Sequence, residues 1–164
     1  MNKMFRGATN FNQNLNSWDG KSYELLVCIS LHPYIQKLTL ASFHTVSKVE
    51  DMSFMFQGAF SFNGDVSSWQ PSNATNFRLA FNNANSFNKD VSTWSISSAT
   101  NMELMFYNAT SFNQNLCLWA DDFPYDGVNG DKSRRIFEAS GCTNQEDPNR
   151  VIRGPFCATT VCPR

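Results

Sequence analysis

Five cysteines and two histidines are the residues of this chain best suited to metal binding or nucleophilic chemistry. Both histidines, His32 and His44, and one cysteine, Cys28, fall in a single atypical stretch. Outside that stretch no nucleophile can be paired with a histidine base, and the sequence has no glycine-rich phosphate loop and no His/Asp metal cluster. The sequence therefore predicts a protein that is not an enzyme and that uses no cofactor and no metal.

The other four cysteines lie toward the C-terminus, at Cys117, Cys142, Cys157 and Cys162. Their even number in one segment indicates disulfides and an oxidising compartment. Four cysteines allow three pairings, and the sequence does not choose between them. Zinc bound by four thiolates is the alternative, but the chain has no Cys-x-x-Cys pair. We expect two disulfides.

Charge and hydropathy exclude two classes of partner. The net charge is -1 and only 16% of the residues are charged, so the chain lacks the basic character of a nucleic-acid-binding protein. No apolar run is long enough for a membrane helix, and no signal peptide opens the sequence. The sequence predicts no nucleic-acid partner and no membrane span.

A 25-residue repeat supplies the framework on which any functional side chain must sit. Phenylalanines recur at this spacing at Phe56, Phe81 and Phe106, and a fourth copy begins at Phe5. Each of these anchor phenylalanines is followed six residues later by a Phe-Asn pair and thirteen residues later by a tryptophan. The pairs begin at Phe11, Phe62, Phe87 and Phe112, and the tryptophans are Trp18, Trp69, Trp94 and Trp119.

Two periodicities within one copy predict its local structure. Apolar residues at helical spacing over 52–59 predict one or two helical turns, and 65–69 is expected to form a short strand after a turn. The expected fold is an α/β repeat solenoid over residues 1–119, with coils starting near 1, 49, 74 and 99. The Phe, Met and Trp columns should form its core. Asparagines at one turn should form a hydrogen-bonded ladder between coils, at Asn63, Asn88 and Asn113.

The units spanning 51–69 and 101–116, with their Met-x-x-Met-Phe and Ser-Phe-Asn motifs, resemble the BspA-like surface-protein repeat. This repeat belongs to the leucine-rich-repeat-like group, and the resemblance covers residues 1–19 and 46–119. It implies a leucine-rich-repeat-like solenoid and a role in adhesion or recognition. It also implies an extracellular or cell-surface location. Because Met1 falls at a mid-coil position, we expect the N-terminus to be incomplete.

Residues 20–45 carry none of the repeat motifs, although removing these 26 residues restores the 25-residue register. They could form a degenerate coil or an inserted loop, although a structureless loop of this length is unusual in a compact domain. The third alternative is a retained intron, which the codons compatible with Gly20–Ser22 favour. We assign no function to this stretch.

Residues 120–164 are expected to form a loop, over 121–132, and a capping segment closed by the cysteines. Arg135–Cys142 echoes the Met-Phe turn of a coil. Two Asn-x-Thr sequons, at Asn73 and Asn108, are glycosylation candidates if the chain is secreted.

The expected binding surface is a small-polar, mildly acidic ribbon along the strands, because side chains flanking an inward apolar residue point outward. We predict weak, multivalent binding of an extracellular protein or cell-surface ligand. The alternatives are a carbohydrate-binding module, which would need exposed tryptophans, and a fragment of a longer array without independent function. The loop at 121–132 is the next candidate site. The ribbon residues are Asn14, Asn16, Asp65, Ser67, Asp90, Ser92 and Asn115.

Overall fold

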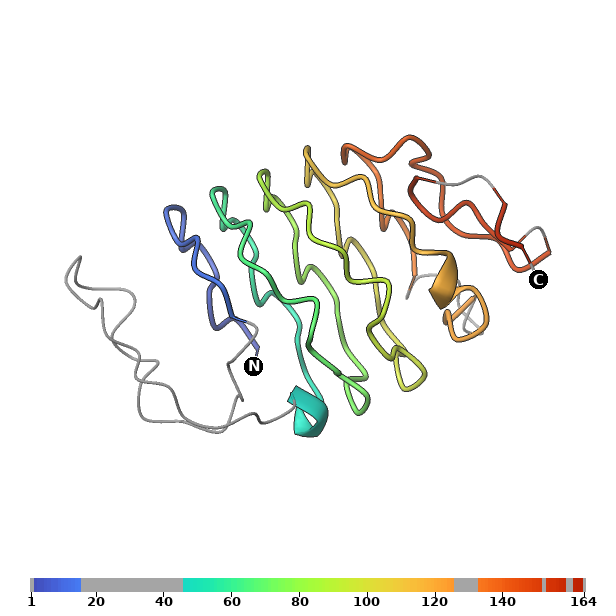
Figure 1. Ribbon diagram of the computed structural model, residues 1–164, viewed down its shortest axis with the longest axis horizontal. Coiled ribbons are helices and arrows are strands. Elements are labelled where there is room, and N and C mark those ends of the chain that lie inside the picture. Colours follow the sequence, from blue (N-terminus) through green and yellow to red (C-terminus); the bar gives the residue numbers. More distant parts are fainter. Residues whose placement is uncertain (1, 16–45, 126–132, 152, 159–160, 164) are drawn as a thin grey trace.

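The computed structural model describes residues 2–15, 46–125, 133–151, 153–158 and 161–163 (Figure 1). Two short 3-10 helices, η2 (Val46–Lys48) and η3 (Cys117–Trp119), are the only helices in these ranges. The β-type pairings in the same ranges are isolated bridges, such as the parallel pair between Asp51 and Asn76. The rest of the described chain is built from turns.

The predicted α/β fold class is therefore wrong: the described units contain neither the expected strand nor the expected helical turns. The reason is a left-handed residue two positions before and two positions after each anchor phenylalanine. Around Phe56 these residues are Phe54, with φ of 59°, and Gly58, with φ of 70°. A right-handed helix needs a negative φ at every residue, so this pair breaks the helix on both sides of the anchor.

The apolar spacing that indicated helical turns comes instead from successive tight turns. The Ala59 N–H donates to the Phe56 carbonyl at 3.0 Å, and the Phe62 N–H donates to the Ala59 carbonyl at 3.0 Å. Each of these turns advances the chain by three residues, so apolar side chains return to the core at the interval typical of a helix. The predicted strand over 65–69 is likewise a turn, closed by a bond from the Trp69 N–H to the Val66 carbonyl at 3.1 Å.

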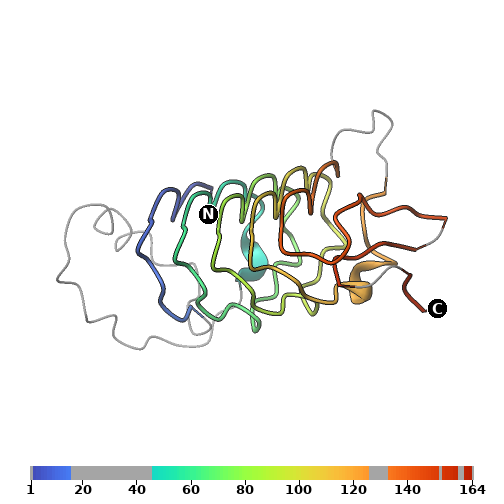
Figure 2. The same cartoon turned by 90° about the horizontal axis from the view of Figure 1, so that it is seen from above.

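The units lie side by side, each bonded to the next through its backbone (Figures 1 and 2). N–H groups of residues 54, 56 and 58 donate to the carbonyls of 78, 80 and 82 at 2.9, 2.7 and 2.8 Å. The same three donors recur in every neighbouring pair, so all of these bonds run from one unit to the following one. The first unit bonds directly to the second, with Phe5 N donating to Met55 O at 2.7 Å. These two units are therefore neighbours even though residues 16–45, which lie outside the described residues, separate them in sequence.

Stacked aromatic rings form the core of the units. Consecutive anchor rings are 5.1 to 6.0 Å apart between centroids, with planes within 16° of parallel. The second phenylalanines form a parallel column at 5.7 to 5.8 Å. Burying each such ring contributes roughly 2–3 kcal/mol, so the two columns are a large part of the hydrophobic stabilisation. The anchor rings are Phe5, Phe56, Phe81, Phe106 and Phe137.

The predicted asparagine ladder is confirmed. The side-chain oxygen of Asn63 accepts the backbone N–H of Asn88 at 3.0 Å, and that of Asn88 accepts the N–H of Asn113 at 3.0 Å. The side-chain oxygen of Asn12 likewise accepts the backbone N–H of Asn63 at 2.7 Å. The amides thus satisfy backbone donors where the turns leave them without a carbonyl.

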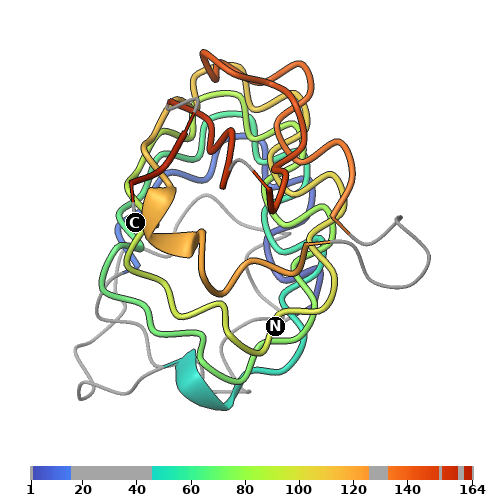
Figure 3. The same cartoon turned by 90° about the vertical axis from the view of Figure 1, so that its right-hand side faces the viewer.

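The C-terminal segment adds one more unit to the stack and then closes its end (Figure 3). Phe106 N donates to Ile136 O at 2.9 Å, and the Phe137 ring stacks on that of Phe106. The stacked units therefore continue past residue 119. In this last unit, side chains replace the carbonyls of a following unit as acceptors: Ile136 N donates to Asp147 Oδ1 at 3.1 Å.

Two disulfides hold this closing segment, which confirms the prediction that the four cysteines pair. Cys117 is bonded to Cys162, and Cys142 is bonded to Cys157. The structure thereby selects one of the three pairings that the sequence left open. We refer to residues 117–125 and 142–163, as far as the structure describes them, as the cap.

Candidate functional site

Two surfaces are candidates for binding: the predicted ribbon along the stack and a pocket in the cap. Among the ribbon residues, Asn14, Asp90 and Asn115 are exposed, whereas Asp65 and Ser67 are half-buried. Ser92 is only 8% exposed, so it does not face solvent as the ribbon model expects. Asn16 lies outside the described residues.

The acidic and amide positions of the ribbon shape turns. The Asp65 carboxylate accepts the Ser67 N–H at 2.9 Å, and the Asp90 carboxylate accepts the Ser92 N–H at 2.8 Å. Asn115 accepts the Cys117 N–H at 3.0 Å in the same way. Each side chain therefore bonds the backbone two residues on, as in an Asx turn, and part of its hydrogen-bonding capacity is used within the fold.

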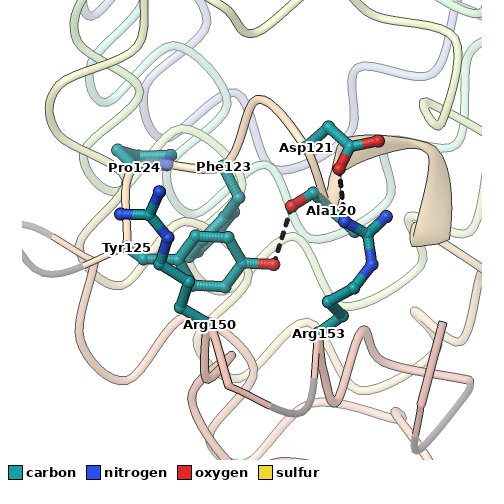
Figure 4. Close-up of a pocket in the computed structure, with 7 residues that line it drawn as sticks. All are labelled: Ala120, Asp121, Phe123, Pro124, Tyr125, Arg150 and Arg153. Carbon is teal, nitrogen blue, oxygen red and sulfur yellow. Dashed lines mark hydrogen bonds and ion pairs between the residues drawn. The ribbon is translucent and has the colours of Figure 1, made fainter. Parts of the chain in front are cut away.

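The cap contains a cavity of about 410 Å³ between the segment that follows η3 and the loop around residues 150–153 (Figure 4). Aromatic side chains pack edge to face beside it. The Phe123 ring lies 5.0 Å from that of Tyr125 and 5.2 Å from that of Phe156, at interplanar angles of 66° and 85°. The residues that line the cavity are Ala120, Asp121, Phe123, Pro124, Tyr125, Arg150 and Arg153.

Tyr125 stands at the centre of the pocket view, with Arg150 on one side and Arg153 on the other (Figure 4). Its hydroxyl donates to the Ala120 carbonyl at 2.9 Å, which fixes the ring. Burial raises the pKa of the Tyr125 hydroxyl above its ordinary value. Tyr125 is therefore a neutral, oriented platform at physiological pH.

The two arginines differ in their partners. Arg153 forms an ion pair with the exposed carboxylate of Asp121, and the Arg153 guanidinium lowers the pKa of that carboxyl below its usual value. Arg150 is exposed and pairs with no carboxylate among the described residues. Together the three groups leave the pocket with one net positive charge.

Large exposed apolar side chains cluster in the cap. Leu118, Val151 and Val161 are 71%, 87% and 60% exposed, and Phe60, at 49%, is the one such residue in the described repeat units. Leu118 and Val161 are each adjacent in sequence to a cysteine of the Cys117–Cys162 disulfide, whose Cα atoms are 5.3 Å apart, so their backbones lie near each other. Exposed apolar side chains that gather in one region are typical of surfaces that contact a partner.

Sequence reasoning reached only part of this pocket. The loop named as the second candidate supplies Asp121 and Tyr125, but Arg150 and Arg153 were missed. A usable signal was present, since the two arginines lie three residues apart beside Gly154-Pro155 and between two cysteines. Surface loops held by a rigid scaffold commonly carry binding residues.

The two glycosylation sequons fall in different environments. Asn73 is exposed at a turn. Asn108 is half-buried, and its side-chain nitrogen donates to the Asn83 side-chain oxygen at 2.6 Å. Because a glycan attaches to this nitrogen, Asn73 is the more accessible of the two positions.

The described part of the chain shows no group of three or more His, Cys, Asp or Glu side chains placed to bind a metal. Among the same residues there is no helix with the length and hydropathy needed to cross a bilayer. The paired cysteines indicate an extracellular, oxidising location.

These features define a class: a protein of turn-built units stacked through aromatic columns and closed by a disulfide-bonded cap. The chain belongs to the family described as "Mycoplasma protein of unknown function, DUF285", whose model matches residues 1–27 and 34–146. No curated protein and no solved structure matches the chain.

Proposed function

We propose that this chain is a non-catalytic recognition module, secreted or displayed at a cell surface, that contacts an extracellular protein through its cap. The BspA-like resemblance of its repeats supports a role in adhesion. The stacked units serve as a scaffold, and the disulfides keep the cap in one conformation. Preorganised surfaces of this kind bind without a large entropic cost of ordering.

The contrast in exposed side chains carries this proposal. Three of the four large exposed apolar residues, and the pocket with its tyrosine and two arginines, belong to the cap. Tyrosine and arginine are enriched in the residues that dominate binding energy at interfaces, and aliphatic neighbours exclude water around them. The ribbon offers only short polar side chains, several of which bond their own backbone.

The carbohydrate-binding alternative has less support. It required exposed tryptophans, but Trp69, Trp94 and Trp119 are each no more than 2% exposed. The tryptophans of the described units pack in the core instead, where Trp69 and Trp94 stack at 5.9 Å.

Binding of the fluorescently labelled, disulfide-bonded protein to extracellular matrix proteins and to intact cells tests this proposal. A cap variant carrying Leu118→Ser, Val151→Ser and Val161→Ser should lose most of the binding while keeping its circular dichroism spectrum and disulfides. A ribbon variant carrying Asp65→Asn and Asp90→Asn keeps the side-chain acceptors of its turns and should bind normally. Phe60→Ser is the matched control for loss of an exposed apolar group.

The opposite pattern, with binding lost in the ribbon variant and retained in the cap variant, would return the site to the ribbon. Equal loss in Phe60→Ser would show that any exposed apolar group contributes and that the cap has no special role.

A further inference from the structure

We propose that the cap pocket is a carboxylate-binding subsite, and that it receives an acidic side chain of a protein partner between Arg150 and Arg153. This inference rests on the proposed recognition function and specifies the chemistry of the ligand. In the unbound chain, Asp121 occupies the position at Arg153 that the carboxylate of the partner would take.

The guanidinium of Arg153 has more donors than its ion pair with Asp121 uses. A guanidinium has five N–H donors in a planar fork, and the ion pair with Asp121 uses only the terminal nitrogen Nη1. The Nε of Arg153 is buried and has no hydrogen-bond partner among the described residues. Because Nε is buried, a ligand would bind the terminal nitrogens instead: once Asp121 leaves Nη1, these two adjacent donors can bind both oxygens of a carboxylate, which is a strong geometry for this pair.

Asp121 is the partner that can be displaced. The Arg153 side chain is 23% exposed, whereas that of Asp121 is 79% exposed and reaches the guanidinium from the solvent side. Because the Asp121 carboxylate is exposed, water solvates it well on release, and the pair contributes little net stability. A ligand carboxylate that also gains contacts to the pocket wall can therefore replace it.

Arg150 and Tyr125 supply the rest of the subsite. Arg150 lies across Tyr125 from Arg153 and is not neutralised by any described carboxylate (Figure 4). The Tyr125 ring lies between the two cations and Pro124 lies on the Arg150 side, so both add apolar surface to the pocket (Figure 4). An anionic group with attached methylene carbons, such as a glutamate side chain, matches this arrangement of charge and apolar surface.

The surroundings favour a peptide over an anionic glycan. Val151 directly follows Arg150, and Leu118 precedes Ala120 by two residues, so exposed aliphatic side chains come from the same segments as the pocket lining and suit the apolar side chains that flank an acidic residue in a peptide. Sugars instead stack on exposed aromatic faces, and the rings of Phe123 and Phe156 are buried. The predicted ligand is therefore a segment in which Asp or Glu alternates with aliphatic residues.

Selection of random peptides displayed on phage by the immobilised, disulfide-bonded chain tests the ligand chemistry. We expect enrichment of Asp or Glu beside Leu, Ile or Val, and loss of that enrichment with Arg150→Gln. Binding of the best synthetic peptide, measured by calorimetry, should weaken about tenfold in Arg150→Gln and in Arg153→Gln. Lys89→Gln, which removes one positive charge from the stack, should leave the affinity unchanged.

Asp121→Asn tests the proposal more sharply, because the proposal predicts that this variant binds the acidic peptide more tightly. Removing the internal carboxylate should tighten binding of the acidic peptide about two- to fivefold. A merely structural ion pair would give equal or weaker binding. No tightening in a variant that keeps both disulfides and a native circular dichroism spectrum would overturn the displacement model.

The failure of this inference can be separated from failure of the proposed function. No acidic enrichment, or preferential binding of hyaluronan oligosaccharides over the peptides, overturns the acidic-peptide subsite. If the cap variant still loses cell binding in that case, the recognition function of the cap stands. If acidic peptides are not enriched and the cap variant also keeps its cell binding, both proposals are overturned.

Discussion

The stacked units and the cap solve the same packing problem in different ways. In the stack, anchor rings lie nearly parallel on rings of their own kind, with planes within 16° of each other. In the cap, Phe123, Tyr125 and Phe156 meet edge to face at 66° to 85°. A repeat can reuse one contact because each unit presents the same surface to the next. The cap has no following unit, so its rings pack on one another.

Backbone hydrogen bonding shows the same contrast. Every unit donates to carbonyls of the unit after it, so the last unit has donors but no further unit to accept them. The cap meets this need with side chains, as Ala139 N donates to Gln145 Oε1 at 3.0 Å. A stack of this kind therefore needs a dedicated segment to close its C-terminal end.

The tryptophans of the described units differ in their hydrogen bonds. Trp69 Nε1 donates to Leu15 O at 2.9 Å, and Trp94 Nε1 donates to Val66 O at 3.0 Å. The indole nitrogen of Trp119 is buried and has no partner among the described residues. Trp119 ends η3, the 3-10 helix with which the cap begins, and its N–H still donates to the Leu116 carbonyl at 2.9 Å, so the turn itself is kept and the indole hydrogen bond is not.

Loss of one stacked ring should have the largest effect. Phe81 lies 5.2 Å from Phe56 and 5.4 Å from Phe106 and is fully buried. We expect Phe81→Ala to lower the free energy of unfolding by about 3–5 kcal/mol, since it leaves a cavity between two rings. Phe60→Ala, at the exposed phenylalanine, should change it by less than about 0.5 kcal/mol. Urea unfolding measures both, and equal effects would contradict the stacked core.

Loss of the disulfides should come next and should separate the cap from the stack. The chain-entropy model gives about 3 kcal/mol for Cys142–Cys157, which closes 15 residues, and about 4 kcal/mol for Cys117–Cys162, which closes 45. The paired Cys→Ser variants, unfolded in denaturant, check these values. If both variants match the unsubstituted protein in stability, the disulfides do not stabilise the cap.

A matched pair of tryptophan variants should show a smaller difference. Trp94→Phe removes an indole hydrogen bond and leaves the Val66 carbonyl without it, whereas Trp119→Phe removes an N–H that has no partner. We expect Trp94→Phe to cost about 1–2 kcal/mol more than Trp119→Phe, beyond the similar loss of volume. Thermal unfolding at matched conditions measures the difference. A larger cost for Trp119→Phe would show that its indole nitrogen is bonded in solution.

The smallest expected effect is on pH dependence. The pKa of Tyr125 is raised, chiefly by burial, so the folded chain holds this proton above the ordinary tyrosine pKa of about 10. The stability that it contributes is complete below that value and is lost as the pH rises through the folded pKa. The ultraviolet difference spectrum between the protein and Tyr125→Phe should show a late titration. Titration at the ordinary value would contradict burial of the hydroxyl.

The sequence predicted those features of the fold that recur with, or are visible beside, the 25-residue repeat. The 25-residue period, the buried Phe and Trp columns, the asparagine ladder and the paired cysteines were all readable, because a side chain that packs on its own copy recurs at the same position. The left-handed residues were partly readable. Gly7, Gly58, Asn83 and Asn108 follow the first four anchors by two positions, and Gly and Asn favour positive φ.

The other left-handed column had no local signal. Phe54, Leu79 and Leu104 have φ of 56° to 59°, a conformation that large side chains disfavour on their own. Contacts with the neighbouring units hold them there, since the N–H of each donates to the following unit. Patterns of apolar spacing carry no information on such a conformation, and the helical prediction failed for this reason. The pocket arginines were missed because they lie outside the repeat.

Hydrogen–deuterium exchange of the protein with and without the tightest-binding acidic peptide tests the central claim, that the cap recognises and the stack supports. The claim predicts slower exchange in the described segments 118–125, 149–151 and 153–158 on binding, with exchange in 65–67 and 90–92 unchanged. Protection along those turns of the ribbon, with no change in the cap, would contradict it.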